Sequence, residues 1–375
     1  MDFNSLLQLM VDKNASDLFI TAGLPPSLKV AGRVAPVTRT RLGPEQVHQV
    51  VHSIMTERQR QEFEDTHECN FALSAKGIGR FRVSAFYQRS NVGMVLRRIE
   101  TEIPKIEDLR LPTIIRDLAM TKRGLIIFVG ATGTGKSTSL ASMIGYRNEN
   151  STGHIISIED PIEFIHAHKG CIVSQREVGI DTESFATALK NTLRQAPDVI
   201  LIGEIRTRET MEYALAFAET GHLVLATLHA NNANQAMDRV INFFPAERLQ
   251  QVYMDLSLNL KAVIAQQLLP TPDGKGRVPA VEILLGTPLV LDKIHQGEIH
   301  EIKEIMKRSR EQGMQTFDQH LYELYRQGLI TYEDALRHAD SANEVRLMAK
   351  LGDTDSASRL EEAADSMNLV VEGDR

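Results

Sequence analysis

The chain has 375 residues, 42% of them hydrophobic and 24% charged, with a formal net charge of −7. This length allows two or three domains, each with its own core. The cysteines, Cys69 and Cys171, lie far apart and predict neither a disulfide framework nor a zinc ribbon. No apolar stretch is long enough to span a bilayer, and the N-terminus lacks the basic segment of a signal peptide. We therefore expect a cytoplasmic protein.

The negative charge is concentrated at the C-terminal end. Residues 352–375 contain seven acidic residues and two arginines, so the rest of the chain carries only about −2. General nucleic-acid binders present basic surfaces, and this near-neutral body predicts no nucleic-acid partner. The polar, acidic composition of residues 351–375 predicts a disordered tail.

The first hundred residues mix helical and strand patterns that do not alternate strictly. This mixture predicts a small α+β domain over residues 1–100. Residues 101–112 combine two prolines with dense charge and predict an interdomain linker. The expected helices cover 5–11 and 44–64, and the expected strands cover 16–21, 27–37 (a hairpin turning at Ala31 and Gly32), 69–74, 79–86 and 92–99.

From residue 113 onward, helices alternate with short apolar strands, which predicts an α/β domain over residues 113–350. Nearly continuous apolar strands between helices indicate a parallel sheet covered on both faces. The expected strands cover 125–129, 154–158, 199–202 and 223–227. After about residue 245 we expect helices over 246–268, 288–296, 316–327 and 331–350, and an edge strand over 278–285.

The first of these strands runs directly into the sequence GATGTGKST, residues 130–138. Its glycines let the backbone turn sharply, so that successive N–H groups point at phosphate oxygens. Lys136 would reach the β- and γ-phosphates, Ser137 would offer its hydroxyl to Mg²⁺, and the next helix would add its positive dipole end. The sequence therefore predicts a site for ATP or GTP with Mg²⁺. The predicted phosphate-binding residues are Gly130, Ala131, Thr132, Gly133, Thr134, Gly135, Lys136, Ser137 and Thr138.

Polar residues follow the other three strands where each strand ends. Glu159, Asp160 and Glu163 follow the second strand, Glu204 the third and His229 the fourth. Ligands of an open parallel sheet bind beyond the carboxyl ends of its strands, so we expect these groups around the phosphates. A carboxylate there can orient the attacking water or hold Mg²⁺. Binding of Mg²⁺ is the role expected of Glu204. A single acidic residue after a strand more often caps a helix or lies in a solvated turn. The prediction of a nucleotide site therefore depends on the acidic residues of several strand ends taken together.

Two histidines frame the fourth strand. His229 could donate to the γ-phosphate and report its loss. His222 lies at the opposite end of the same strand, and from its position alone a structural role is about as well supported as a catalytic one.

Arginines crowd into one segment of the first domain, where Arg80 and Arg82 share a strand face while Arg97 and Arg98 point oppositely. One interpretation is an exposed, charged sheet edge. The other is that Arg80, Arg82 and Arg97 approach a nucleotide bound to a neighbouring subunit. An arginine supplied in trans can accelerate phosphoryl transfer by about 10³–10⁵-fold. Arg194 and Arg206 are competing candidates in the second domain.

The motifs together resemble the type IV pilus retraction ATPases of the secretion-ATPase superfamily. GATGTGKST is similar to the Walker A loop of that family, ISIEDPIEF to its Asp box, LRQAPDVILIGEIR to its Walker B segment and TGHLVLATLHANN to its His box. The resemblance extends to about residue 345. It implies a PAS-like N-terminal domain, a RecA-like P-loop core and a homohexamer that hydrolyses ATP at its subunit interfaces to retract pili. It also implies nucleotide-site roles for Lys136, Glu163, Glu204, His222 and His229.

Two departures refine this resemblance. Related extension and secretion ATPases carry a zinc-binding cysteine cluster, which two distant cysteines cannot form. The C-terminal motif AIRNLIRE of the retraction motors appears here only as LVLDKIHQ, residues 289–296. With the acidic tail, this is similar to a paralogous branch that works beside the main retraction ATPase. The implied partners are that ATPase and the inner-membrane pilus platform, through which alone the chain would associate with the membrane. Two alternatives stay open: an accessory subunit that modulates the paralogue, and a RecA-like DNA translocase, which the near-neutral body disfavours.

Overall fold

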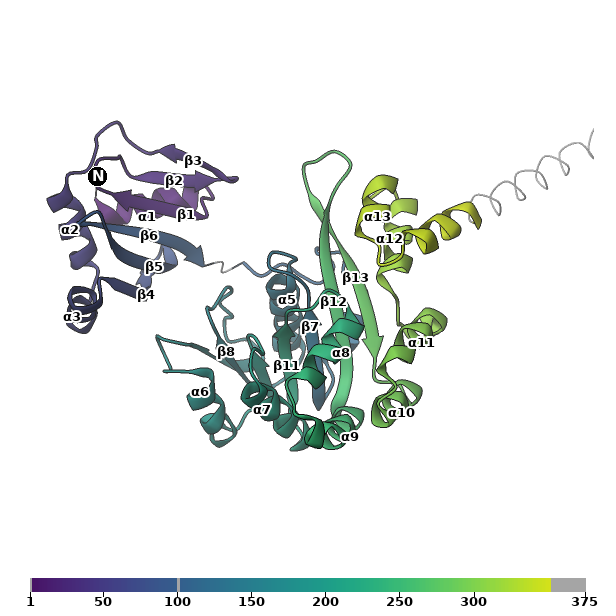
Figure 1. Ribbon diagram of the computed structural model, residues 1–375. Coiled ribbons are helices and arrows are strands. Elements are labelled where there is room, and N and C mark those ends of the chain that lie inside the picture. Colours follow the sequence, from purple (N-terminus) through teal and green to yellow (C-terminus); the bar gives the residue numbers. More distant parts are fainter. Residues whose placement is uncertain (1, 100–101, 352–375) are drawn as a thin grey trace, which may run out of the picture. The chain divides into compact units, whose positions relative to one another are not determined.

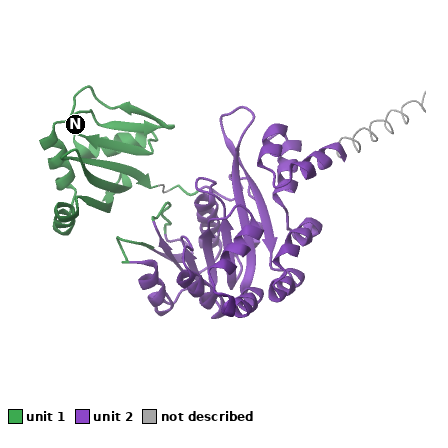
Figure 2. Cartoon of the chain, in the orientation of Figure 1, with its two compact units in different colours: residues 1–103, 161–167, 176–183 green, residues 104–160, 168–175, 184–375 purple. Residues whose placement is uncertain are grey.

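The computed structural model describes residues 2–99 and 102–351, which divide into two compact units (Figure 2). Unit 1 comprises Met1–Ile103 with two later segments, Pro161–Ala167 and Arg176–Glu183, and unit 2 holds the remainder. The predicted tail, apart from residue 351, lies outside the described residues. The predicted linker, 101–112, is shared between the units, because Ile106 and Leu111 are buried in the core of unit 2.

Unit 1 is built on an antiparallel sheet of six strands in the order β3-β2-β1-β6-β5-β4 (Figure 1). Apolar side chains of its three helices pack against one face of this sheet and form a separate core with it. The elements are α1 (Phe3–Asp12), β1 (Asp17–Thr21), β2 (Ser27–Val30), β3 (Arg33–Pro36), α2 (Pro44–Ser53), α3 (Glu57–Thr66), β4 (Glu68–Ala75), β5 (Gly79–Gln88) and β6 (Asn91–Ile99).

The predicted hairpin over residues 27–37 is confirmed. Strands β2 and β3 pair from Ser27↔Pro36 to Val30↔Arg33. Ala31 and Gly32 have φ values of 49° and 81°, as both central residues of a type I′ turn require.

The single helix predicted over residues 44–64 is wrong, because two helices occupy this stretch. Thr56 caps the second helix: its hydroxyl accepts from the Gln59 N–H, and the Gln59 side chain accepts from the Thr56 N–H at 2.9 Å. This reciprocal capping box satisfies N–H groups that the start of a helix leaves unpaired, so it favours a new helix at Glu57.

Unit 2 contains a sheet of seven strands in the order β13-β12-β7-β11-β10-β8-β9. The five strands from β12 to β8 run parallel, and β13 is antiparallel to β12. Four of the parallel strands are those predicted from the sequence, and they are now β7 (Gly124–Val129), β8 (Gly153–Glu159), β10 (Val199–Ile202) and β11 (Leu223–Leu228). The remaining three strands of the sheet are β9 (Cys171–Glu177), β12 (Leu260–Pro270) and β13 (Arg277–Leu285).

Helices cover both faces of this sheet (Figure 1). Helices α4 and α5 contribute to the apolar core on one face, α6, α7 and α8 lie against the other, and α9 packs against α7 and α10. Among the described residues, no helix is both long and apolar enough to cross a bilayer. The helices are α4 (Ile114–Ala119), α5 (Lys136–Asn150), α6 (Phe185–Thr192), α7 (Arg208–Glu219), α8 (Ala233–Asn242), α9 (Leu249–Asn259), α10 (Pro288–Gln296), α11 (Ile302–Arg308), α12 (Phe317–Arg326) and α13 (Tyr332–His338).

The helix predicted over residues 246–268 is wrong in its second half. Helix α9 ends at Asn259, and strand β12 begins at the next residue and pairs with β7. Ala262, Val263, Ile264 and Ala265 are all fully buried, so this strand is covered on both faces. A strand of that kind lacks polar alternation, and its periodicity cannot be distinguished from that of a buried helix. The helix predicted over 331–350 is likewise interrupted at residues 339–341.

Candidate nucleotide-binding site

The loop predicted to bind phosphate connects β7 to α5, as expected. Gly130, Gly133 and Gly135 have φ values of 152°, 81° and 86°, which side chains disfavour. A Cβ atom on Gly130 would lie 2.5 Å from the Gln266 carbonyl oxygen, and one on Gly135 would lie 2.8 Å from Gln266 Nε2. Glycine is therefore required at these two positions by both conformation and space.

Lys136 is the first residue of α5 and is 9% exposed. Its Nζ donates to the carbonyl oxygens of Gly130 at 2.8 Å and Ala131 at 2.7 Å. The ammonium group is thus held against the loop by main-chain acceptors. The N-terminus of α5 presents backbone N–H groups at the same point, and the two together favour an anion.

The outer part of the loop is open to solvent. Ala131, Thr132 and Gly133 are exposed, whereas Thr134 is partly buried. Ser137 and Thr138, also partly buried, lie in the first turn of α5 directly after Lys136. This arrangement leaves the loop accessible to a phosphate chain and puts a hydroxyl next to the lysine, which fits the donor set that Mg²⁺–nucleotide sites use.

Gln266 is a site residue that sequence reasoning missed. It lies on β12, is 2% exposed, donates to the Thr134 carbonyl at 2.9 Å and accepts from the Ser139 hydroxyl at 2.7 Å. A buried amide with both ends bonded holds its partners in place, so Gln266 fixes the loop to α5 and to the sheet. Its signal in the sequence is a pair of glutamines inside an apolar run, a stretch for which the periodicity predicts a helix and not a strand.

Glu204 and His229 are brought together, as predicted. Strands β10 and β11 are parallel neighbours, with Ile202 opposite Ala226, so the residues after them meet at one edge of the sheet. His229 Nε2 lies 3.1 Å from Glu204 Oε1, and an Arg206 guanidinium nitrogen lies 2.7 Å from Oε2. Both oxygens of one carboxylate are thus held by nitrogen donors.

The pKa of the Glu204 carboxyl depends on burial and on nearby positive charges, including that of Lys136 in the phosphate loop. Burial raises the pKa of its carboxyl, but the hydrogen bond from Arg206 and the positive charges of His229, Arg206 and Lys136 outweigh burial and hold this pKa below its ordinary value. Glu204 is therefore ionised at neutral pH. Strands β7, β11 and β10 are parallel neighbours, so the phosphate loop after β7 and Glu204 after β10 lie at the same edge of the sheet.

Glu159 ends β8 at the same edge. Its Oε1 accepts from the Ser157 hydroxyl at 2.6 Å and from the Gln175 amide at 3.2 Å. A Cβ atom on Gly203 would lie 3.0 Å from Glu159 Cα, so the glycine before Glu204 lets the two strand ends approach. Glu163, in contrast, belongs to unit 1, and its assignment to the nucleotide site stays a prediction.

His222 lies at the opposite edge of the sheet, before β11 begins. Its ring Nδ1 is 3.1 Å from the Phe217 carbonyl, and its own carbonyl accepts from the Gly124 N–H at 3.0 Å. The six residues of β11 lie between it and His229, which puts the two histidines about 23 Å apart at roughly 3.3 Å per residue step. Within one chain, the His222 ring therefore contacts a carbonyl of the last turn of α7, and His222 is remote from Lys136.

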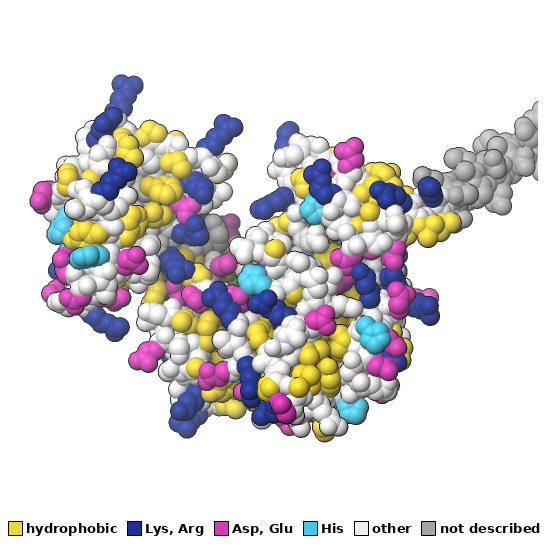
Figure 3. Space-filling model, viewed as in Figure 1, with side chains coloured by type: hydrophobic (Ala, Val, Ile, Leu, Met, Phe, Trp, Pro, Cys, Tyr) yellow, Lys and Arg dark blue, Asp and Glu magenta, His cyan; other side chains and the backbone are white. Residues whose placement is uncertain are grey.

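The predicted arginines lie on the face of the unit 1 sheet that the helices leave uncovered. Arg82 is opposite Arg97 on β6, and Arg97 is opposite Asp17 on β1. Arg97 Nε donates to Asp17 Oδ1 at 2.9 Å, so Arg97 neutralises a buried carboxylate. Arg80 Nε is buried and has no hydrogen-bond partner among the described residues. Figure 3 shows Lys and Arg side chains over the visible surface of this unit.

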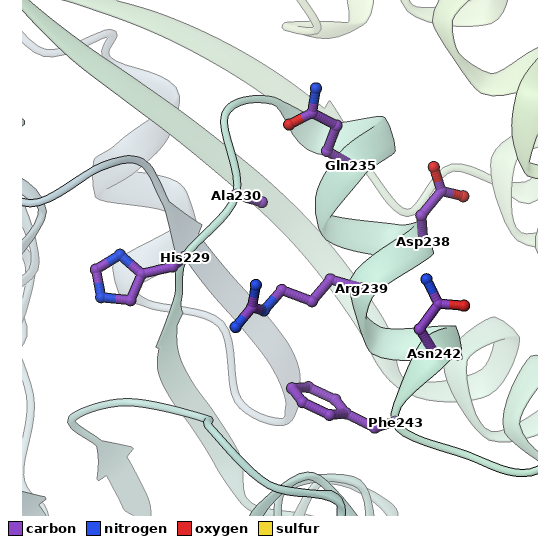
Figure 4. A pocket seen from close by; sticks show the side chains of 7 residues that line it. All are labelled: His229, Ala230, Gln235, Asp238, Arg239, Asn242 and Phe243. Carbon is purple, nitrogen blue, oxygen red and sulfur yellow. The ribbon is translucent and has the colours of Figure 1, made fainter.

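A cavity of about 430 Å³ opens beside His229. Figure 4 shows the Arg239 side chain extending from α8 toward the strand end that carries His229. The edge of the sheet beside His229 is thus hollowed, and Arg239 adds a further cation there. The lining residues are His229, Ala230, Gln235, Asp238, Arg239, Asn242 and Phe243.

Glu282 ties the His229 loop to the C-terminal helices. This residue of β13 is 2% exposed and accepts from the Ala233 N–H at 2.7 Å and the Phe317 N–H at 3.3 Å. Ala233 and Phe317 are the first residues of α8 and α12, so one carboxylate satisfies two helix N-termini. Burial raises the pKa of Glu282 to about 7, although both hydrogen bonds oppose the rise.

This raised pKa predicts how stability depends on pH. The folded state binds the Glu282 proton more tightly than the unfolded chain, so the stability this group contributes is full below about pH 4.5 and is lost as pH rises through about 7. Glu282→Gln should remove that component, which amounts to about 3 kcal/mol at most. Urea unfolding across this range, with the exposed Glu333→Gln as control, measures it. Parallel pH profiles for Glu282→Gln and the wild type would contradict the prediction.

A family model described as "Type II/IV secretion system protein" matches residues 3–342. The chain is 70% identical over 374 residues to the type IV pilus ATPase PilU of Pseudomonas aeruginosa, a match covering 100% of this chain and 98% of that protein. It is 42% identical over 339 residues to the type IV pilus retractation ATPase PilT of the same organism, covering 90% and 98%.

Solved structures agree with these sequence relatives. The pilus retraction motor PilT with bound ADP superposes with a TM-score of 0.87 at 42% identity, over 92% of this chain and 99% of that chain. The ATPase DotB of Legionella pneumophila superposes with a TM-score of 0.76 at 29% identity, over 88% and 93%. The predicted α/β fold with a RecA-like core is thereby confirmed.

Proposed function

Since this chain belongs to the type II/IV secretion system protein family and is a P-loop ATPase related to the pilus ATPases PilU and PilT, we propose that it powers pilus retraction. It does so as a homohexamer, in the cytoplasm at the inner face of the cytoplasmic membrane, in twitching motility. The observation that carries the proposal is the cluster of Lys136, Glu204 and His229 at one edge of the sheet.

Each residue of the cluster has a separate task. The loop N–H groups and Lys136 bind the phosphates of ATP and oppose the charge that develops on them during hydrolysis. Ser137 and Glu204 are the residues that would hold Mg²⁺, which when bound neutralises phosphate charge. Glu163 and Glu159 orient the water, and His229 exchanges its contact with Glu204 for the γ-phosphate. For His222 we propose a role at the nucleotide site of a neighbouring subunit.

Unit 1 supplies the cations that complete the site of the neighbouring subunit. Arg97 has an internal task, since it neutralises the buried Asp17. Arg80 and Arg82 lie on the same sheet face, and their charges oppose the rise that burial causes in the pKa of Glu177. Arg80 Nε makes no hydrogen bond within the described residues, so we propose these two arginines for contact with a nucleotide in trans. An arginine of this kind contributes about 10³–10⁵-fold to turnover, which makes hydrolysis depend on assembly.

Mixed rings test this arrangement. Lys136→Ala subunits should lack turnover but keep their arginines, whereas Arg80→Ala/Arg82→Ala subunits should bind ATP without turning it over. Mixing the two inactive proteins should restore part of the ATPase rate, because some interfaces then combine an intact loop with intact arginines. The control mixes Lys136→Ala with a triple variant that lacks the lysine and both arginines, which should stay inactive. Mixed rings that form but show no regained turnover would contradict the proposal.

The alternative is an accessory subunit that binds a paralogous pilus ATPase and modulates it, with its own hydrolysis secondary. Its motivation is α10, whose residues 289–296 depart from the retraction-motor motif and whose Leu289 is 54% exposed. The ATPase rate, measured with and without the paralogue, separates the two functions. Turnover by the paralogue that rises when Lys136→Ala protein is added favours the accessory role, because that variant should not hydrolyse ATP itself, and turnover by this protein alone favours the motor. Docking on the inner-membrane platform is common to both.

A further inference from the structure

Two histidines and a glutamate converge on the helices of unit 1, on the opposite side of its sheet from the arginine face, which carries Arg80, Arg82 and Arg97. His48 and His52 lie one turn apart on α2, and their rings stack with centroids 4.0 Å apart and an angle of 16° between planes. Glu64 projects from the neighbouring helix α3. Figure 3 shows histidine side chains next to acidic ones on the surface of this unit.

The ligand atoms of these residues are close enough to share one ion. One ring nitrogen of each histidine and one oxygen of Glu64 all lie within 4.8 Å of one another. His52 Nε2 is 3.2 Å from Glu64 Oε1, yet it is enclosed and makes no hydrogen bond within the described residues. A buried ring nitrogen without a hydrogen bond is costly unless another partner occupies it. Glu64 is half exposed, so an ion could enter from solvent.

The backbone beneath the cluster is rigid. The Thr56–Gln59 capping box fixes the start of α3, and Arg60 Nε donates to the His52 carbonyl at 3.0 Å, which ties α3 to the end of α2. Phe63 packs edge-on against the His52 ring at 5.9 Å between centroids. Ligands on two helices that are fixed to each other need little rearrangement to close on a metal.

We propose that His48, His52 and Glu64 form a binding site for a divalent transition metal of the Zn²⁺ class. Two imidazoles and one carboxylate are a ligand set typical of zinc, with water in the fourth position of a tetrahedron. Mg²⁺ prefers oxygen ligands and does not compete for such a site. The ion cross-links α2 to α3 and stabilises the unit that carries the arginine face. This site is separate from the nucleotide loop and does not use either cysteine.

Cobalt provides the probe, because tetrahedral Co²⁺ absorbs visible light and replaces Zn²⁺. Titration of the nucleotide-free, full-length protein with Co²⁺ should show a single tetrahedral site per chain, which Zn²⁺ then displaces. His48→Gln and Glu64→Gln should each weaken binding by at least about tenfold. Zn²⁺ should raise the melting temperature of the wild type but not that of Glu64→Gln.

The matched control is His67→Asn, in the same unit but outside the cluster. Asparagine tolerates the left-handed conformation that His67 adopts at φ 63°, so this variant should bind Co²⁺ like the wild type. Glu64 is exposed and His48 only partly buried, so both test variants should stay folded, which circular dichroism verifies. Absence of tetrahedral absorption in the wild type, or equal affinities in the wild type and both variants, would overturn the proposal.

Discussion

Replacing Lys136 with alanine should lower the ATPase rate by about 10²–10³-fold or more, because the ammonium group is the charge nearest the transferred phosphate. The loop itself should survive. Lys136 Nζ donates to main-chain carbonyls of the loop, whereas the loop is fixed to the sheet through Gln266. Phosphate release from purified protein measures the rate, and thermal unfolding should shift by no more than a few degrees.

The control for this variant is Lys190→Ala, which removes an exposed lysine of α6 in the same unit. It should leave both rate and melting temperature unchanged. In cells, Lys136→Ala should fail to support twitching wherever loss of the whole protein abolishes it. A purified variant that keeps more than about a tenth of wild-type turnover would remove the lysine from the mechanism, since that loss is under 1.4 kcal/mol of transition-state stabilisation.

Replacing Glu204 with glutamine should also stop hydrolysis, but with a different signature. The carboxylate is ionised and held by His229 and Arg206, and the amide has nearly the same shape without the charge. The rate should fall by about 10²–10³-fold, whereas the affinity for ADP should change less than tenfold, because phosphate binding depends on the loop. Fluorescent-nucleotide titration and single-turnover hydrolysis separate the two quantities.

Glu212→Gln on α7 is the matched control, since its carboxylate pairs with Arg208 at the surface. It should leave both rate and affinity unaltered. If Glu204→Gln loses nucleotide affinity in proportion to its rate, Glu204 binds the ground state and does not act selectively on the transition state. Because the pKa of Glu204 lies below its ordinary value, any loss of activity through its protonation should set in at a lower pH than for an ordinary glutamate.

Much of the nucleotide site follows from the sequence because its requirements are local. The loop glycines are needed where φ is positive, the lysine and serine follow at fixed spacing, and the strand before them is a short apolar run. Each of these features depends on neighbours only a few residues away. The strands ending before Glu204 and His229 were also predictable, and parallel topology then forces their ends to one edge.

Contacts between residues far apart in the sequence could not be predicted from local patterns and became known only from the tertiary structure. Gln266 and Ser139 are bonded across 127 positions of chain, and no local pattern marks that pairing. The pairing of β12 with β7 converted an expected helix into a strand and so created the contact. The same applies to Arg97, which the first domain uses to neutralise Asp17, and to Glu282, which joins two helix N-termini. Local backbone geometry is set by adjacent residues, whereas the partners of buried polar groups are set by packing. The sequence alone therefore determined which residues can bind a nucleotide, and the tertiary structure decided which residues hold them in place.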